Sequence, residues 1–246
     1  MPLQRPKIRL FVEAVLDSET NLELDHDQCH YLVKVMRLGR GDELALFNGR
    51  DGEWRAEMID SGRRACRVAL RERVLAQPTA ADLGLLFAPL KRSRLEILVE
   101  KATELGVTRL QPVMTRYTAV RRLNLPRLAA HAREAAEQCG RLEVPELAEP
   151  RALDELLAAW PGARPLYWCD ERGGGQPAAA LFAACQAPAD LLVGPEGGFA
   201  PDEAVRLDGL AAAVGVDLGP RVLRADTAAV VVLGLWQALA GNIAKM

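Results

Sequence analysis

Two stretches of this chain carry glycine, proline and charged residues directly after apolar runs, which is where ligand-binding loops often begin. The first, VGPEGGFAPDE, spans residues 193–203, and the second, LGPRVLRADTA, spans residues 218–228. Carboxylates such as Glu196 and Asp226 can accept a proton or hold a cation, and a guanidinium such as Arg224 can stabilise developing negative charge. If both stretches follow strands of one sheet, they predict the walls of a single pocket. The alternative is two tight turns, in which Glu196 only orients its loop and Asp226 only caps a helix.

The spacing of the glycines excludes the two common phosphate-binding loops. GPEGGF does not fit GxGxxG, and GxxxxGK[ST] does not occur in the sequence. Glu196 and Asp226 would also repel a phosphate, because like charges a few ångströms apart interact strongly at low dielectric. The two stretches therefore favour a neutral or cationic ligand held by backbone donors and acceptors. A nucleotide-dependent oxidoreductase remains a rival, against which the missing phosphate fingerprint counts.

The elements that must position these loops alternate along the chain from Leu83 onward. Apolar runs predict strands at 83–88, 107–113, 165–169, 191–193 and 216–218. Helical periodicity predicts helices at 94–105, 125–139, 153–160 and 178–185, and another that starts at Pro201. Strands joined by helical crossovers imply a parallel sheet in an α/β domain, whose ligands bind at the carboxyl ends of the strands.

The ends of three helices carry specific expectations. Ser93 and Glu96 have the spacing of a capping box at the start of one helix. Ala200 precedes Pro201 and offers no side-chain oxygen, so the free N–H groups there must find water or a ligand. Asp226 or Thr227 is the expected N-cap of the final helix, which is almost wholly apolar and is therefore expected to be buried.

The N-terminal residues 1–73 show a different pattern. Short apolar stretches alternate with glycine turns, and Asn48-Gly49 between two such stretches is a strong hairpin signal. This pattern predicts a small β-barrel or sandwich, with one helix at 27–38. Residues 74–82 then form a linker to a second domain, 83–246.

Composition limits the class of protein. The chain has 246 residues, half of them hydrophobic, which is enough for one large core or two modest ones. The net charge is only −2, yet Gly84–Arg133 holds ten basic and three acidic residues, whereas Glu134–Met246 holds eight basic and sixteen acidic ones. This asymmetry predicts a basic face on a nearly neutral molecule, although solvated helix faces would give the same counts.

The remaining global signals point to the cytoplasm. The N-terminus lacks the pattern of a signal peptide, and no apolar run approaches the length of about 20 residues that crosses a bilayer. The cysteines are odd in number and scattered, which suits a reducing compartment, and their spacing predicts no metal site.

Taken together, the motifs resemble one known family. GPEGGF followed by LGPRVLRADTA resembles the RsmE family of the SPOUT superfamily, which methylates N3 of a uridine in 16S (small-subunit) ribosomal RNA with S-adenosylmethionine. The resemblance covers nearly the whole chain: residues 30–49 look like the family's PUA-like RNA-binding barrel, 91–107 like the opening of its methyltransferase domain, and 137–146 like its mid-domain motif. It implies a parallel α/β sheet with a C-terminal trefoil knot, preceded by the PUA-like barrel, and a homodimer formed through the knot.

The resemblance also implies site residues. The catalytic candidates are Arg224, Asp226 and Glu196. The cofactor-binding candidates are Leu192, Gly194, Pro195, Glu196, Gly197, Gly198, Leu218, Gly219, Arg221, Val222, Leu223, Thr227 and Ala228. The RNA-binding candidates are Lys34, Arg37, Lys91, Arg92, Arg94, Arg121, Arg122 and Arg141.

The sequence departs from the family pattern in three places. Arg116, Tyr117 and Thr118 stand where the family usually has a Glu-Arg pair and a small residue, Asp226 stands where Glu is usual, and Ala200 replaces the usual Ser cap. A non-catalytic protein that binds RNA or assists ribosome assembly on the same fold is therefore a second alternative.

Overall fold

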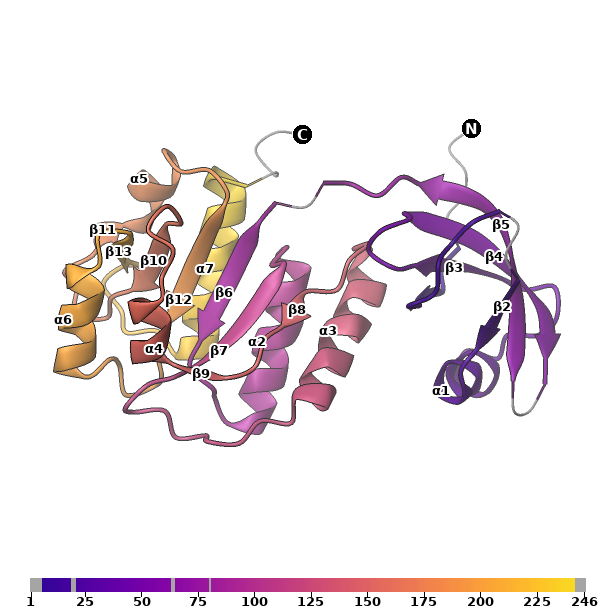
Figure 1. Ribbon diagram of the computed structural model, residues 1–246, viewed down its shortest axis with the longest axis horizontal. Helices are drawn as coiled ribbons and strands as arrows, with labels where there is room; N and C mark the ends of the chain where they lie inside the picture. Colours follow the sequence, from indigo (N-terminus) through magenta and orange to yellow (C-terminus); the bar gives the residue numbers. More distant parts are fainter. Residues whose placement is uncertain (1–5, 19–20, 63–64, 80, 242–246) are drawn as a thin grey trace. The chain divides into compact units, whose positions relative to one another are not determined.

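The chain folds into two compact units, each built on its own β-sheet (Figure 1). The structure is a computed structural model that describes residues 6–18, 21–62, 65–79 and 81–241. The first unit comprises residues 1–79 and 136–144, and the second comprises 80–135 and 145–246. The change of pattern seen in the sequence near residue 80 thus coincides with a change of architecture.

The first unit is a curled five-stranded sheet. Its elements are β1 (Arg9–Phe11), β2 (Asn21–Leu24), α1 (His26–His30), the π-helical turn η1 (Tyr31–Val35), β3 (Glu43–Phe47), β4 (Glu53–Ser61) and β5 (Cys66–Leu75). The strand order is β1-β3-β4-β5-β2, with β1 parallel to β3 and the other pairs antiparallel. The expected hairpin at Asn48-Gly49 is present between β3 and β4, and Gly49 has φ +79°. The predicted helix 27–38 is shorter and changes to π-helix at Tyr31.

Two features of this unit were not expected from the sequence. Cys29 and Cys66 form a disulfide with their Cα atoms 5.5 Å apart, although the odd number and scattered positions of the cysteines had suggested a reducing compartment. Residues 136–144, which had been assigned to the second domain, belong here because Arg9 binds them: its guanidinium donates to the carbonyl oxygens of Ala136, Glu137 and Arg141 at 2.6–2.8 Å. Spatial neighbours more than 30 residues apart leave no local signal in a sequence.

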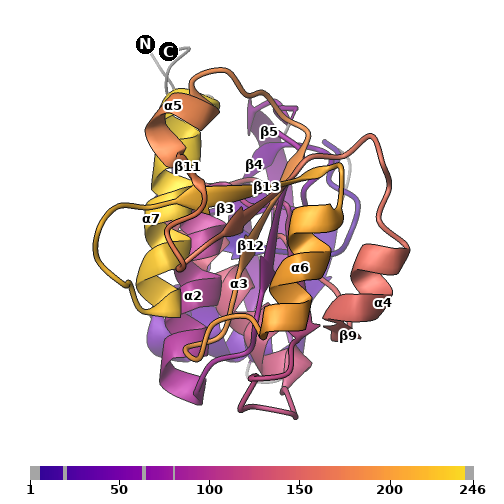
Figure 2. The ribbon, with the colours of Figure 1, turned by 90° about the vertical axis from the view of Figure 1, so that its left-hand side faces the viewer.

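The second unit is a parallel α/β sheet. Its elements are β6 (Leu83–Phe87), α2 (Arg92–Glu104), β7 (Arg109–Met114), α3 (Leu125–Cys139, which ends in the first unit), β8 (Glu146–Leu147), β9 (Arg151–Ala152), α4 (Leu153–Ala158), β10 (Leu166–Cys169), β11 (Gln176–Pro177), α5 (Ala178–Phe182), β12 (Ala189–Val193), α6 (Pro201–Gly209), β13 (Ala213–Asp217) and α7 (Ala225–Leu239). The order is β11-β13-β10-β12-β6-β7-β8, with β9 also paired to β7. Helices α2, α5 and α7 cover one face of the sheet, and α4 and α6 cover the other (Figure 2).

The central strands explain why the loops after them converge. Every residue of β6, β10 and β12 is buried, as expected for strands covered on both faces. Val193 pairs with Phe87 and Cys169 pairs with Val216, so these parallel strands end at the same edge of the sheet. At the opposite edge, the buried carboxylate of Asp190 accepts hydrogen bonds from Arg109 and Arg164 at 2.6–3.1 Å, which neutralises it.

Two predicted helix starts are wrong. α2 begins at Arg92 with Lys91 as N-cap, so Ser93 lies inside the helix, and Glu96 pairs with the guanidinium groups of Arg92 and Arg127 instead of capping. α7 begins at Ala225 with Arg224 as N-cap, two residues before Asp226 and three before Thr227, the expected caps. Among the helices that the structure describes, none is both long and apolar enough to cross a bilayer.

Candidate functional site: a pocket at the carboxyl ends of the strands

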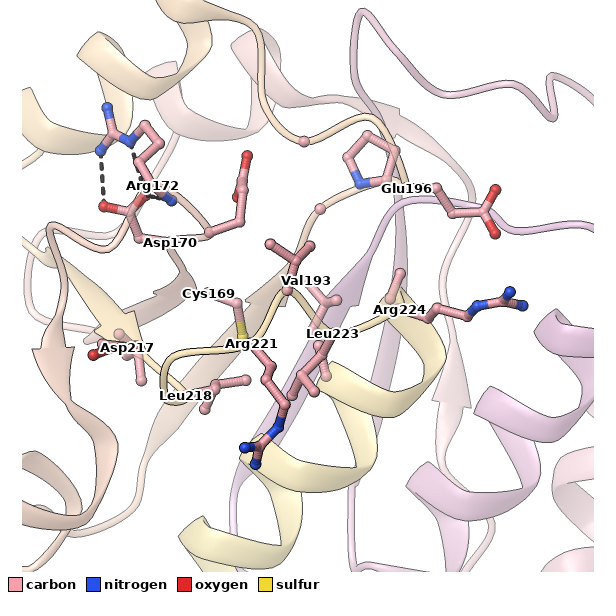
Figure 3. Close-up of a pocket in the computed structure, with 18 of the residues that line it drawn as sticks. Cys169, Asp170, Arg172, Val193, Glu196, Asp217, Leu218, Arg221, Leu223 and Arg224 are labelled. Carbon is pink, nitrogen blue, oxygen red and sulfur yellow. Dashed lines mark hydrogen bonds and ion pairs between the residues drawn. The ribbon is translucent and has the colours of Figure 1, made fainter.

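A pocket of about 620 Å³ lies at the carboxyl ends of β10, β12 and β13, entirely within the second unit (Figure 3). Its walls come from three loops and from the start of two helices, α2 and α7. The lining residues are Lys91, Arg94, Cys169–Gly173, Val193–Glu196, Gly198, Val216–Ala225 and Ala228. Both stretches singled out in the sequence therefore line one pocket, at the edge where ligands of α/β proteins bind.

The glycines of the first loop are explained by how the loop packs. A Cβ on Gly194 would lie 2.8 Å from the Phe199 ring, whose own position is fixed edge-on against Trp168 at 5.6 Å between centroids. Gly198 has φ +71°, a backbone conformation that is unfavourable for residues with a Cβ atom. The Glu171 carboxylate lies over Gly198 and accepts the Phe199 N–H at 3.2 Å. Glycine at position 194 is thus needed mainly so that the loop can pack against the ring of Phe199.

The start of α6 is held by the side chain of Glu203. As expected, the helix begins at Pro201 with Ala200 as the cap residue. The Glu203 carboxylate folds back and accepts the Ala200 N–H at 2.8 Å, and its other oxygen accepts the Arg116 N–H at 2.8 Å. Glu203 therefore supplies the N3 half of a capping box, which Ala200 cannot complete, and it also fastens the loop after β7 to the helix.

The second loop turns sharply beside another segment of chain. Gly219 has φ +107°, and the carboxylate of Asp217 accepts its N–H at 2.8 Å. Gly175 lies against the backbone where β13 ends: a Cβ there would lie 2.6–2.7 Å from atoms of Val216 and Asp217. The position of the second loop therefore depends on close backbone contact that only glycine permits.

The cations of the pocket divide into two groups. Arg94 pairs with Glu196, and Arg172 pairs with Asp170 and Asp208, so these guanidinium groups are already neutralised. By contrast, the side chains of Lys91, Arg221 and Arg224 form no ion pair within the described parts of the chain. Figure 3 shows Arg224 on the same side of the pocket as Glu196, and Arg221 beside Leu218 and α7. Unpaired cations at a pocket are available for an anionic or electron-rich partner.

Asp170 is the most buried carboxylate of the pocket. Burial alone would raise its pKa, but the charged hydrogen bonds from Arg172 at 2.7 and 3.0 Å outweigh burial and hold the pKa below its ordinary value. Asp170 is therefore ionised at neutral pH, and it fixes the turn that follows β10.

The Asp170–Arg172 pair gives a prediction about pH. A carboxyl group with a lowered pKa stabilises the fold above its unfolded-state pKa, about 3.9, and this contribution disappears as pH falls through the folded-state value. Arg172→Met leaves Asp170 buried without its partner and should cost about 1–2 kcal/mol at pH 7, because Arg172 itself is partly exposed. The difference from the unmodified chain should shrink below pH ~4.

Urea unfolding at pH 7 and at pH ~3.5 measures this difference. Asp208→Asn is the matched control, because it removes only the exposed partner of Arg172 and should change the stability little. An equal loss of stability at both pH values would show that Arg172 acts through packing on Trp168, 5.0 Å away, and not through Asp170.

Cys169 also lines the pocket, and its chemistry is restricted by burial. Burial, with a smaller contribution from the nearby Glu171, raises the pKa of its thiol to about 12. The group is a neutral thiol at physiological pH, and a thiol is a poor nucleophile. The pocket therefore suits direct transfer between two bound reactants better than a covalent cysteine intermediate.

The structure places most of the predicted site residues around this pocket. Of the cofactor-binding and catalytic candidates, those that line it are Gly194, Pro195, Glu196, Gly198, Leu218, Gly219, Arg221, Val222, Leu223, Arg224 and Ala228. Leu192, Gly197, Thr227 and Asp226 do not line it directly, and the Asp226 carboxylate accepts the N–H of the adjacent Thr227 at 3.1 Å.

The RNA-binding candidates fall into different environments. Lys91 and Arg94 line the pocket, whereas Lys34, Arg37, Arg121 and Arg122 are exposed at other places, and Arg92 pairs with Glu96. Arg141 differs, because only 12% of its side chain is exposed and it pairs with Glu143 at 3.5 Å, which leaves little surface for a phosphate.

Sequence reasoning missed the third wall of the pocket, Cys169–Gly173. A signal was present: an acidic pair, Asp170-Glu171, and three glycines follow directly on a predicted strand, as in the other two loops. Any polar loop at the carboxyl end of a strand in this sheet belongs to the same edge.

Comparison with known proteins agrees with this architecture. Residues 63–237 match the family described as the RNA methyltransferase domain, and residues 24–70 match the RNA methyltransferase PUA domain. A curled β unit joined to a parallel α/β unit with a pocket at its strand ends is thus the two-domain form of an RNA methyltransferase.

The relatives define the family more narrowly. Ribosomal RNA small subunit methyltransferase E from Rickettsia conorii is 32% identical over 225 residues, which cover 90% of this chain and 91% of the relative. The protein of the same name from Synechocystis is 33% identical over 94% of this chain and 77% of its own length. Among solved structures, a Legionella pneumophila protein with the bound cofactor SAM superposes with a TM-score of 0.84 at 28% identity, over 95% of this chain and 98% of that one. The chain belongs to the ribosomal RNA small subunit methyltransferase E family, which confirms the resemblance seen in its motifs.

Proposed function

We propose that this chain transfers the methyl group of S-adenosylmethionine to N3 of a uridine in 16S ribosomal RNA. The observation that carries the proposal is that GPEGGF and LGPRVLRADTA, the motifs that resemble the family, wall one pocket together. The solved relative with bound SAM and the curated relatives named for small-subunit ribosomal RNA support the choice of cofactor and substrate.

The pocket fits a cofactor of this size and charge. A volume of about 620 Å³ lies in the range of roughly 300–1,000 Å³ typical of small-molecule sites. The loops 194–198 and 218–223 present backbone donors and acceptors, and the carboxylates of Glu171 and Asp217 lie among the lining residues, where they favour a cation. When bound, S-adenosylmethionine supplies an electrophilic methyl group on a positively charged sulfur.

We assign to Arg224 the role of stabilising the uracil during the reaction. Removal of the N3 proton spreads negative charge onto the uracil carbonyl oxygens, and a fixed guanidinium beside them stabilises that charge. Arg224 is exposed at the pocket as the N-cap of α7, where a rigid helix holds its backbone.

The carboxylates have less direct roles in this proposal. Glu196 pairs with Arg94, and it can accept a proton from N3 only if the base displaces that guanidinium. Holding the first loop against α2 is therefore its main role. Asp226 remains a candidate base, although its carboxylate caps the adjacent backbone and does not line the pocket.

RNA must present the uridine unpaired, because N3 of a paired base is hydrogen-bonded and out of reach. Lys91 and Arg221 at the pocket, with the exposed cations at residues 34, 37, 121 and 122, would hold its phosphates, and such contacts weaken as salt concentration rises. The first unit, which matches a PUA domain of RNA methyltransferases, would supply part of this grip.

We also propose that the chain is a homodimer with a trefoil knot, as the family resemblance implies. Support comes from α7: the sequence predicted a buried helix, yet Val230 and Leu239 are 38% and 37% exposed. A second copy of the chain would cover the side of the helix that carries Val230.

Introducing a charged side chain on the exposed side of α7 tests whether the chain forms a dimer. Val230→Lys should convert a dimer of the unmodified chain into monomers, because a lysine cannot be buried unpaired in an apolar interface. Sedimentation equilibrium measures the molar mass. Val205→Lys is the matched control, since Val205 is 68% exposed on α6, which covers the opposite face of the sheet from α7, and the variant should remain dimeric. A monomeric unmodified chain would contradict the proposal.

The proposed reaction is tested by incubating the protein with methyl-labelled S-adenosylmethionine and unmodified small ribosomal subunits. Digestion of the RNA to nucleosides and mass spectrometry should show 3-methyluridine. Another methylated nucleoside would contradict the N3 assignment. Cofactor binding without any methylated product would favour the alternative of a non-catalytic RNA-binding protein.

A further inference from the structure

Tyr117 is an aromatic side chain that the proposed reaction leaves without a role. It lies in the turn that follows β7, and 49% of it is exposed. The residues around it in the turn behave differently: Thr115 and Thr118 are both 97% buried, since only 3% of each is exposed. The turn therefore buries its polar anchors and presents its ring to the outside.

The turn is held firmly from both sides. Thr118 Oγ1 accepts the Thr115 N–H at 2.9 Å and lies 2.9 Å from the Thr115 hydroxyl. The Arg116 N–H donates to Glu203 at 2.8 Å, and the Arg116 guanidinium donates to Asp202 at 2.7 Å. Because these hydrogen bonds fix the backbone on each side of Tyr117, little conformational entropy would be lost when the ring meets a partner.

The ring lies beside the first loop of the pocket. A Cβ on Gly197 would be 3.4 Å from Cβ of Tyr117 and 3.8 Å from its Cγ and Cδ2, so no side chain separates the ring from that backbone. The residues on either side of Gly197, Glu196 and Gly198, both line the pocket. Tyr117 thus lies directly beside the loop that forms one wall of the pocket.

Cations accompany the ring on the same loop. Arg121 and Arg122 are exposed, and neither forms an ion pair within the described parts of the chain. An exposed aromatic ring followed by unpaired guanidinium groups is the combination with which proteins hold single-stranded nucleic acid, because the ring stacks on a base while the cations meet the phosphates.

We propose that Tyr117 is the stacking platform for an unpaired nucleobase of the RNA beside the pocket. The inference rests on the proposed function for the identity of the RNA. The ring holds the strand beside the pocket, and Arg121 and Arg122 hold the phosphates that follow. Tyr117 is thereby a substrate-positioning residue and takes no part in proton transfer.

The first test compares Tyr117→Phe, which keeps the ring, with Tyr117→Leu, which keeps apolar bulk without it. With small ribosomal subunits as substrate, Tyr117→Leu should raise KM about tenfold or more, and Tyr117→Phe should stay within about threefold of the unmodified protein. The affinity for S-adenosylmethionine should be the same in all three. Val205→Ala, another exposed apolar side chain outside the pocket, is the control for a general loss of surface area. Equal KM values for Tyr117→Leu and the unmodified protein, or equal losses for Phe and Leu, would overturn the proposal.

The second test does not need methyl transfer. Small-subunit RNA that contains 5-iodouridine is irradiated with the protein, and the cross-linked peptide is located by mass spectrometry. A cross-link at Tyr117, lost in Tyr117→Leu, supports stacking even if no 3-methyluridine is ever formed, in which case the proposed reaction alone fails. Cross-links confined to other peptides would overturn the stacking role.

Discussion

Replacing Arg224 by alanine is expected to lower the rate of methyl transfer by about 10²- to 10³-fold, the usual effect of removing one group that stabilises developing charge. The side chain is exposed at the pocket and has no ion-pair partner among the described residues, so its removal leaves no buried charge behind. Its backbone carbonyl accepts the Ala228 N–H at 2.7 Å and is unaffected, so α7 should still form. The fold and the binding of S-adenosylmethionine should therefore persist.

Single-turnover rates with small subunits measure the effect, and calorimetry measures cofactor binding. Arg224→Lys is the matched variant: it keeps the charge but loses the planar pair of donors, so it should recover only part of the rate. Arg221→Ala removes the other unpaired guanidinium of the same loop and should act mainly on binding. Turnover of Arg224→Ala within about threefold of the unmodified protein would remove Arg224 from the mechanism.

The sequence predicted the framework of this site because its signals are local. Apolar runs located the central strands of the α/β unit. Helical periodicity located helices, and the predicted bounds of α3 and the predicted start of α6 were correct to the residue. The two glycine-containing loops follow predicted strands, and the rule that parallel strands end at one edge was enough to join them in one pocket.

What the sequence could not predict depends on partners that are distant along the chain. Glu196 is a candidate base, but no local pattern indicated that Arg94 of α2 would pair with it. Ser93 was a candidate cap until Arg92 and Arg127 were found to bind Glu96. In both cases a charged partner, Arg94 for Glu196 and Arg127 for Glu96, came from an element that is distant along the chain.

Gly175 lies outside the pocket lining, yet it is expected to be among the positions least tolerant of change. Gly175→Ala would place a Cβ 2.6–2.7 Å from backbone atoms of Val216 and Asp217, and backbone in a sheet cannot rotate away as a side chain can. Overpacking of this kind costs about 1–3 kcal/mol. Because Asp217 holds Gly219 through its carboxylate, the strain should pass into the second loop and weaken S-adenosylmethionine binding about tenfold or more.

The contrast with Gly209→Ala isolates the crowding from the general effect of a methyl group. Gly209 is the last residue of α6, and a Cβ there would meet no atom within 4 Å, so this variant should match the unmodified protein in stability and in cofactor affinity. Urea unfolding and calorimetry on the three proteins separate the outcomes. If Gly175→Ala loses stability but binds the cofactor normally, the contact between Gly175 and β13 supports the fold alone. If it loses affinity as well, this contact also holds the pocket in shape, and the chain segments that pack at Gly175 are as much a part of the site as the loops that line it.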